Sequence, residues 1–424
     1  MKAMADCGLW SAGWEMWEER LRRTLLSLFF VSLGLPVAIQ QTALGLSLAF
    51  LAYVGWRNQG LPTTPLARPL LLCLAALLLS TLFSPDVLNS LLGYRKLWLV
   101  GAFFVTYHLV QKPPEAWRLV SLMVMVATGV AAYGIVQHFI GIDLAKQLMG
   151  KEPKLTPFWF GRQEGFRTEG LFPTGITYAH NLSFPLTFLT ALLFAPELHW
   201  HRRLALLAGW GLMVFALLFS LTRGVWLAYV VILALLGVAR GRRALLAVGA
   251  CAGLLGLFLC GAGFGVRERA LQVFDLKDNL GRSQIWQANL DMIKARPLLG
   301  WGYGNYKKFR DPYYQRYPEA DTTAHAHNNF LQIWVDSGLL GLAAFLYLFW
   351  VILRTGWQAY RLVPVATEPL YSLALGSTLS IVGFLLGGLT QYNFGDAEVV
   401  IVLWATAGVV LRMREWAAGD GVGG

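Results

Sequence analysis

The chain has 424 residues, of which 56% are hydrophobic and only 14% are charged. An ordinary soluble protein carries about 25% charged residues, so a soluble globular fold is excluded. The net charge of +11 lies largely in short loops between apolar segments. Charge distributed in this way orients a membrane protein, and no nucleic-acid partner is expected.

In chain order, the first predicted element is an interfacial helix. Trp10, Trp14 and Trp17 recur at helical spacing in a segment that also carries Glu15 and Glu18. Such a helix favours the plane of the membrane surface. The segment lacks the pattern of a cleavable secretory signal, and no such signal is expected.

Twelve membrane-spanning helices are predicted after this segment, so the fold class is all-α and polytopic. A membrane β-barrel would instead require short alternating segments. The first two spans are short and meet at Gln40-Gln41, so they are interpreted as a helical hairpin. The predicted spans are 24–39, 42–56, 67–83, 97–110, 117–140, 182–195, 204–221, 225–239, 244–264, 331–353, 370–389 and 398–411.

Basic residues give this topology an orientation. With a cytoplasmic N-terminus, every inner connection carries at least two of them, whereas the short outer connections carry only Arg95, Lys96 and Arg223. This positive-inside bias predicts a multi-pass membrane protein with both termini in the cytoplasm. The inner basic residues are Arg20, Arg22, Arg23, Arg57, Arg68, Lys112, Arg118, Arg202, Arg203, Arg240, Arg242, Arg243, Arg354, Arg361, Arg412 and Arg414.

Two long loops, 141–181 and 265–330, fall on the outer, periplasmic side of a single membrane-embedded domain, 1–424. Loops of this length are usually functional or disordered, and their many aromatic residues argue against disorder. Residues 282–296 form an amphipathic pattern that ends at Pro297, which predicts a helix lying as a shelf on the membrane surface.

The second loop ends in the cluster His325-Ala326-His327-Asn328. In an extended segment, residues two apart point to the same side, so both imidazoles could face one cleft. A neutral imidazole can accept a proton from a sugar hydroxyl at neutral pH. The alternative is that Asn328 or Asn329 caps the helix that starts near Phe330, and that the histidines have no role in chemistry. Two histidines without a third ligand make a zinc site weak, so no metal or other cofactor is expected.

Three arginines fall on the same predicted side of the membrane as the histidines. They are Arg167, Arg223 in a tight turn between two spans, and Arg282 at the start of the amphipathic helix. Arginine offers a fixed charge and a bidentate fork that suit a diphosphate. Arg167 could instead pair with Glu164 or Glu169. Arg223 could be an interfacial anchor, and Arg282 could be solvated.

The order of these motifs along the chain resembles the O-antigen ligase/polymerase superfamily of bacterial inner membranes. Arg95, at an outer helix end, is a secondary candidate for binding lipid phosphate. The resemblance covers residues 160–350, and the ligases are the preferred match. It rests on Arg167-x-x-Gly170-x-Phe172, Ser220-x-x-Arg223-Gly224, Arg282-x-x-x-Trp286, Lys294-x-x-Pro297-Leu298-x-Gly300-x-Gly302-x-Gly304-Asn305 and His325-x-His327-Asn328-x-x-Leu331.

The resemblance implies a GT-C-like helical fold and an inverting, metal-independent glycosyltransferase. The donor would be a glycan on undecaprenyl diphosphate, and the acceptor would be lipid A–core at the periplasmic face. Arg167, Arg223 and Arg282 would bind the diphosphate. His327 would be the general base with His325 in support, and Asn328 and Trp286 would be secondary site residues.

Two alternatives remain open from the sequence. An O-antigen polymerase of the same superfamily shares the arginine and histidine motifs. A transporter of lipid-linked glycans is a further alternative, although acidic residues are nearly absent from the predicted spans, where proton-coupled transport often requires them.

Overall fold

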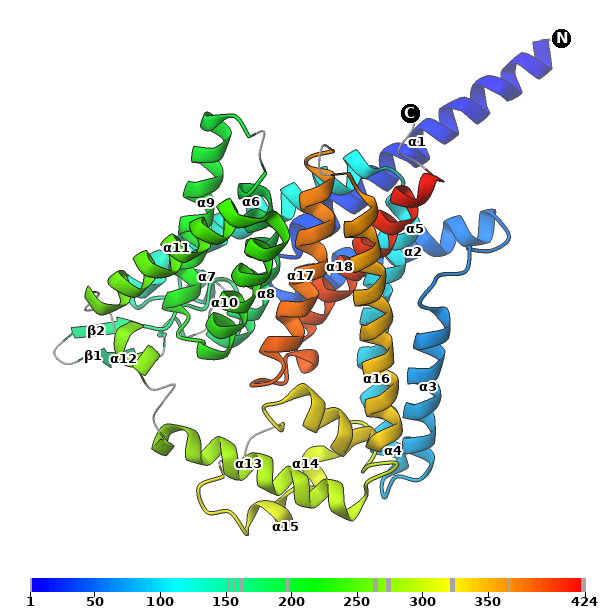
Figure 1. Cartoon of the computed structure of the whole chain (residues 1–424). Helices are drawn as coiled ribbons and strands as arrows, with labels where there is room; N and C mark the ends of the chain where they lie inside the picture. Colours follow the sequence, from blue (N-terminus) through cyan, green and yellow to red (C-terminus); the bar gives the residue numbers. More distant parts are fainter. Residues whose placement is uncertain are drawn as a thin grey trace.

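The chain folds almost entirely into helices, as predicted (Figure 1). The structure, a computed structural model, describes residues 2–148, 150, 152–155, 157–160, 163–195, 198–261, 266–271, 276–320, 325–364 and 367–420. Its elements are α1 (Lys2–Ser32), α2 (Val37–Arg57), α3 (Ala67–Leu82), α4 (Val87–Gly93), η1 (Tyr94–Val100), α5 (Gly101–Leu109), α6 (Pro113–Ile140), α7 (Leu144–Leu148), β1 (Pro157–Phe160), β2 (Gln163–Phe166), α8 (Gly175–Leu193), α9 (Trp200–Phe219), α10 (Arg223–Arg240), α11 (Arg242–Gly261), α12 (Val266–Leu271), α13 (Leu276–Ala295), α14 (Tyr306–Phe309), α15 (Asp311–Tyr314), α16 (Asn329–Leu362), α17 (Leu370–Gly387), η3 (Asn393–Gly395), α18 (Ala397–Glu415) and η4 (Trp416–Asp420).

Among the described residues, six helices are long and apolar enough to cross a membrane: α2, α6, α9, α10, α16 and α17. The shorter α3 is also apolar. These helices confirm the polytopic membrane class, while the number of twelve spans stays a prediction. A departure from the all-α expectation is the antiparallel hairpin β1–β2, in which Phe158 lies opposite Gly165.

The predicted break at Gln40-Gln41 is wrong, because both residues lie inside α2. The chain turns instead between Ser32 and Pro36, which is the N-cap of α2. Proline lacks an N–H and disfavours helical geometry in the preceding residue, so it separates the two helices. The Gln40 amide donates to the carbonyls of Leu33 (3.1 Å) and Leu35 (2.9 Å), and this supports the turn.

Three other predicted boundaries also move. The 97–110 segment is divided between η1 and the short α5. α8 begins at Gly175 because Thr174 caps it by accepting a hydrogen bond from Thr177 N at 3.1 Å, so the loop predicted as 141–181 ends earlier. α13 begins at Leu276 instead of residue 282, which puts Arg282 in the second turn of the helix and not at its start.

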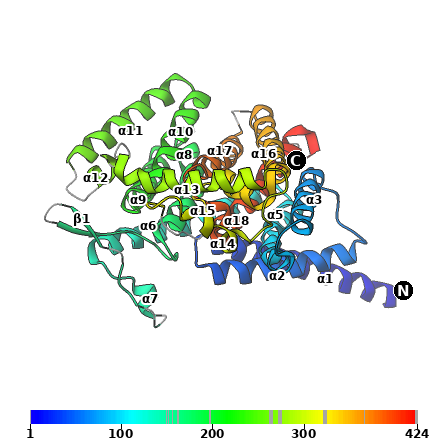
Figure 2. The same ribbon diagram turned by 90° about the horizontal axis from the view of Figure 1, so that it is seen from below.

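The polar loop before α16 folds as a shelf, made of α13, α14 and α15, across one end of the bundle (Figures 1 and 2). α16 bends at Gly338, whose φ of +66° is non-helical. The carbonyls of Val335 and Asp336 accept from Trp301 N and Gly302 N, both at 2.9 Å. A break in a helix leaves backbone groups without partners, and here the glycine-rich loop satisfies them. The shelf is thereby fixed to α16.

A small hydrophobic core lies between the shelf and α16, separate from the large core of the bundle. Ile285, Met292, Tyr306 and Val335 belong to it, and so does Ala326, which is fully buried. Because Ala326 separates the two histidines of the motif, burial of its methyl group fixes their position on the bundle. The amphipathic face predicted from residues 282–296 therefore packs against protein.

Candidate active site

The turn between α9 and α10 anchors the first arginine. The Arg167 Nε donates to the Ser220 carbonyl (2.8 Å), and its Nη2 donates to Thr222 Oγ1 (3.1 Å). Within this turn, Leu221 has a φ of +55°, a left-handed conformation that residues other than glycine rarely adopt. Arg167 thus lies beside the residues that precede Arg223. Strain of this kind is often found at functional sites.

Arg223, at the start of α10, and Arg282, in the shelf helix α13, lie close enough to repel each other. Burial lowers the pKa of the Arg282 guanidinium, and repulsion from Arg223 lowers it further. Burial also lowers the pKa of Arg167. Two partly buried guanidinium groups that repel each other form a ready site for an anion, because an anion relieves both the repulsion and the desolvation.

A fourth cation at this turn was not identified from the sequence. The Arg269 Nε donates to the carbonyl of Leu221 at 3.3 Å. Arg269 belongs to the six-residue helix α12, which follows a long apolar segment. Its sequence, in Val266-Arg267-Glu268-Arg269, reads as a solvated face, so only the tertiary structure identifies it as part of the arginine cluster.

The two predicted imidazoles lie together, with ring centroids 4.4 Å apart at an interplanar angle of 70°. The expected extended geometry is wrong, because His327 has a φ of +49°. His325 Nδ1 accepts from the backbone N–H of His327 at 3.3 Å. A tight turn closed by this bond, instead of an extended strand, brings the two rings together.

His327 is oriented by a residue from the loop after α17. Its Nδ1 lies 2.7 Å from Oε1 of Gln391. An amide oxygen only accepts, so it holds the proton on Nδ1 and leaves the lone pair of the neutral ring on Nε2. This is the tautomer that a general base acting through Nε2 requires. Gln391 was absent from the sequence-based candidates, because it lies in a short loop with no motif.

The same loop brings the arginine cluster to the histidines. A Cβ atom on Gly224 would come within 2.0 Å of Thr390 Oγ1, so the start of α10 approaches this loop as closely as only glycine allows. Thr390 directly precedes Gln391, the partner of His327. Residues 220–224 and 325–327, about 100 residues apart in the chain, therefore meet through residues 390 and 391.

Gln332 supports the histidine loop from the first turns of α16. Its Oε1 accepts from the N–H of Ala326 (2.8 Å), and its Nε2 donates to Asp336 Oδ2 (3.0 Å). Asn328 Oδ1 accepts from the backbone N–H groups of Phe330 (2.8 Å) and Leu331 (3.1 Å). Of the two asparagines, Asn328 is thus the helix cap, and the cap fixes the loop that carries the histidines.

His325 lies in a strongly basic environment. Burial, together with repulsion from His327, Lys307 and Arg310, lowers its pKa to about 4. The ring is therefore neutral at pH 7. Arg310 Nη1 is buried without a hydrogen-bond partner in the described part of the chain. The shelf thus adds cations to the histidine side of the site.

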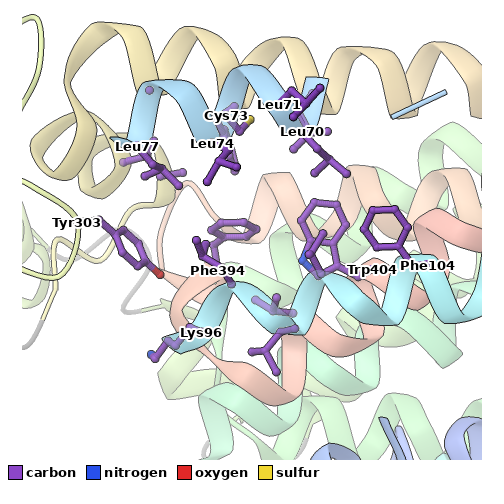
Figure 3. Close-up of a pocket in the computed structure, with 18 of the residues that line it drawn as sticks. Leu70, Leu71, Cys73, Leu74, Leu77, Lys96, Phe104, Tyr303, Phe394 and Trp404 are labelled. Carbon is purple, nitrogen blue, oxygen red and sulfur yellow. The ribbon is translucent and has the colours of Figure 1, made fainter. Parts of the chain in front are cut away.

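An apolar groove of about 600 Å³ lies beside α3 (Figure 3). Apolar residues of α3, among them Leu70 and Leu74, line it opposite Phe104 and Trp404. Its volume is in the range of lipid and ligand pockets. At its polar end Tyr392 lies with its ring 5.8 Å from that of His325, and Lys96 donates to Gly395 O at 2.9 Å.

The remaining predicted candidates are less central. Arg95 is exposed on η1. Trp286 packs against the shelf core, and its Nε1 is buried without a hydrogen-bond partner among the described residues. Glu169 pairs with Lys146 rather than with Arg167. The Glu164 side chain lies outside the described residues, as do those of Trp10 and Trp14.

Residues 208–346 match the family model for O-antigen ligase. The chain is also similar to an O-antigen ligase of Salmonella typhimurium strain LT2, with 31% identity over 129 residues. That match covers 29% of this chain and 30% of the relative, so the relative is matched over less than a third of its length. Arg223, Arg282, His325 and His327 fall within the segment that matches the family model. The two matches agree with the resemblance that the motifs predicted, and the family model places it over residues 208–346.

Proposed function

We propose that the protein is a membrane glycosyltransferase of the O-antigen ligase type, which moves a glycan from undecaprenyl diphosphate to lipid A–core. The observation that carries the proposal is that the turn carrying Arg223 packs, at Gly224, against Thr390, and that the next residue, Gln391, contacts His327. It supports one site in which cations and a base face the same substrate. The site would lie at the periplasmic face of the inner membrane, as the charge bias predicts.

In the proposed reaction, Nε2 of His327 takes the proton from an acceptor hydroxyl. The hydroxyl oxygen attacks the anomeric carbon from the side opposite the diphosphate, and a new glycosidic bond forms with inversion. The bond from the anomeric carbon to the diphosphate breaks, and its electron pair leaves with undecaprenyl diphosphate. A positioned base typically contributes 10²–10⁴-fold to such a step.

Arg167, Arg223 and Arg282 would stabilise the negative charge that develops on the diphosphate. The fixed positions of these groups matter, because preorganised charges need no rearrangement during the reaction. His325, neutral at pH 7, would support His327 without adding a positive charge beside the base. The apolar groove would hold the lipid chain of one substrate, with its polar end next to the histidines.

The test is glycan transfer in proteoliposomes from a purified undecaprenyl diphosphate donor to lipid A–core. We expect His327→Ala and Arg223→Ala each to reduce transfer by at least about 100-fold. Arg316→Ala is the matched control of unchanged activity, because Arg316 is an exposed arginine of the same loop outside the candidate site. Retained activity in both site variants would remove the proposal. Deletion of the gene in the native host separates the two family members. A single repeat unit still attached to core would indicate a polymerase. Loss of all polymer from core, with lipid-linked polymer accumulating, would indicate a ligase.

A further inference from the structure

A second cavity, of about 580 Å³, lies between α8, α9, α10 and α11. Arg203 lies near the start of α9, Arg240 ends α10, and Arg243 is the second residue of α11. All three line the cavity. The turn that carries Arg223 is at the opposite ends of α9 and α10. α10 has 18 residues, and at about 1.5 Å per residue it spans roughly 27 Å. The cavity therefore lies near the other membrane surface from the candidate active site.

Arg240 is a fixed part of the cavity wall. It pairs with Glu368 at 2.6 Å, donates to the carbonyl of Ala191 at 3.1 Å and lies 4.4 Å from the ring centroid of Tyr371. Its charge is therefore compensated. Its Nε is nevertheless buried and has no hydrogen-bond partner in the described part of the protein.

The other two arginines have no ion-pair partner among the described residues. Arg203 donates to the carbonyl of Ala195 at 2.9 Å, and its Nε is buried with no partner in the same part of the chain. Arg243 is exposed at the start of α11. Both groups point to an anion that the described residues do not supply.

The rest of the cavity wall is apolar. Leu207 and Trp210 contribute from α9, Leu233 from α10, and Ala247 and Val248 from α11. α9 stands upright in Figure 1, whereas α11 runs obliquely away from the end of α10, so the helices that line the cavity are not parallel. An apolar wedge with guanidinium groups at one end matches a molecule with an acyl chain and an anionic headgroup.

We infer that this cavity binds an anionic glycerophospholipid of the leaflet opposite the candidate active site. The phosphate would accept hydrogen bonds from Arg203 and Arg243, and one acyl chain would lie along Leu207, Trp210 and Val248. Basic pockets between membrane helices on the cytoplasmic side commonly bind such headgroups. The charge bias of the sequence predicts that this end of the bundle is cytoplasmic. The inference is independent of the proposed transferase activity.

The test is native mass spectrometry of the purified, delipidated full-length protein with added dioleoylphosphatidylglycerol or dioleoylphosphatidylcholine. We expect the anionic lipid to be retained preferentially, by about fivefold for each of Arg203 and Arg243. Arg243→Gln should reduce the preference about fivefold, and the exposed position of Arg243 leaves the fold intact. Arg242→Gln is the matched control, because Arg242 is also exposed but does not line the cavity.

A second variant tests the apolar part without changing a charge. Leu207→Trp fills the wedge, and we expect it to reduce retention of phosphatidylglycerol at least as much as Arg243→Gln does. An unchanged preference in Arg203→Gln and Arg243→Gln would overturn the inference. The inference would also be overturned if inorganic phosphate displaced all of the phosphatidylglycerol and Leu207→Trp still bound this lipid normally. The cavity would then be a site for free phosphate.

Discussion

His327 and Gln391 form a hydrogen bond of 2.7 Å between residues 64 positions apart in the chain. This bond assigns a tautomer to the candidate base, and it joins the loop before α16 to the loop after α17. Since neither loop is part of a regular element, their relative position depends on a few contacts. Each of these contacts can be tested.

Gln391→Leu should reduce glycan transfer about 10- to 100-fold, because the leucine cannot hold the proton on Nδ1 of His327. Gln391→Glu is the matched control, since a carboxylate oxygen accepts the same hydrogen bond and should retain most activity. The measurement is kcat as a function of pH in proteoliposomes. Equal activity of Gln391→Leu and wild type would show that this bond does not position the base.

Gly224→Ala should reduce both activity and stability, because its Cβ would lie 2.0 Å from Thr390 Oγ1, so the Thr390 side chain or the loop that carries it must move. Overpacking of this kind costs about 1–3 kcal/mol. Thr390→Ala removes the colliding oxygen, so the double variant should recover part of both losses. Gly211→Ala is the control, since nothing lies within 4 Å of its added methyl group. Thermal unfolding and transfer rates in detergent check the expectation.

Arg282→Gln should separate stability from activity. In the ligand-free protein the Arg282 guanidinium is partly buried and repelled by Arg223, so its removal should leave the Tm equal to or above that of wild type. Transfer should nevertheless fall by roughly 100-fold or more, because one diphosphate ligand is lost. A Tm several degrees lower would mean that Arg282 has a structural role instead.

His325 should make the protein less stable at acidic pH. Its pKa is lowered to about 4 in the folded protein, from an ordinary value of 6.5, chiefly by burial. The unfolded chain therefore binds more protons between these values, and stability falls as the pH drops from 6.5 toward 4. The slope is at most about 1.4 kcal/mol per pH unit for one group. The Tm of His325→Gln should depend less on pH in this window, and an unchanged pH profile would contradict the assignment.

The apolar groove should influence the affinity for a lipid substrate more strongly than it influences the rate of the chemical step. Leu74→Trp narrows the groove, so it should raise the KM for the lipid-linked donor severalfold and change kcat less. Leu72→Trp is the matched control, because Leu72 is exposed on the same helix and does not line the groove. Identical KM values for the two variants would indicate that the donor chain lies elsewhere.

The sequence by itself determined the helical membrane class, because runs of apolar residues satisfy their backbone hydrogen bonds only within helices in a bilayer. It also identified the arginines and histidines as candidates, because polar groups of these types stand out at the ends of apolar segments. The turn before Arg223 was predictable for the same reason. The family match to residues 208–346 contains most of these motifs.

The boundaries were less predictable where local contacts decided them. The turn between the first two helices lies at Pro36, earlier in the chain than the polar pair Gln40-Gln41 suggests. Thr174 starts α8 inside a segment that reads as loop. In each case one cap or one proline determines the boundary, and hydropathy averaged over many residues does not detect it.

Only the tertiary structure decided how the candidate residues meet. Gln391, Thr390 and Arg269 have no distinguishing motif, and each belongs to the site through a contact between segments far apart in the chain. Sequence periodicity reports which face of a helix is buried, but it carries no information on which loops close against each other. That is set by the packing of α10 and α17 and by the attachment of the shelf to α16 at Gly338, where a broken helix turn exposes the carbonyls that the shelf binds.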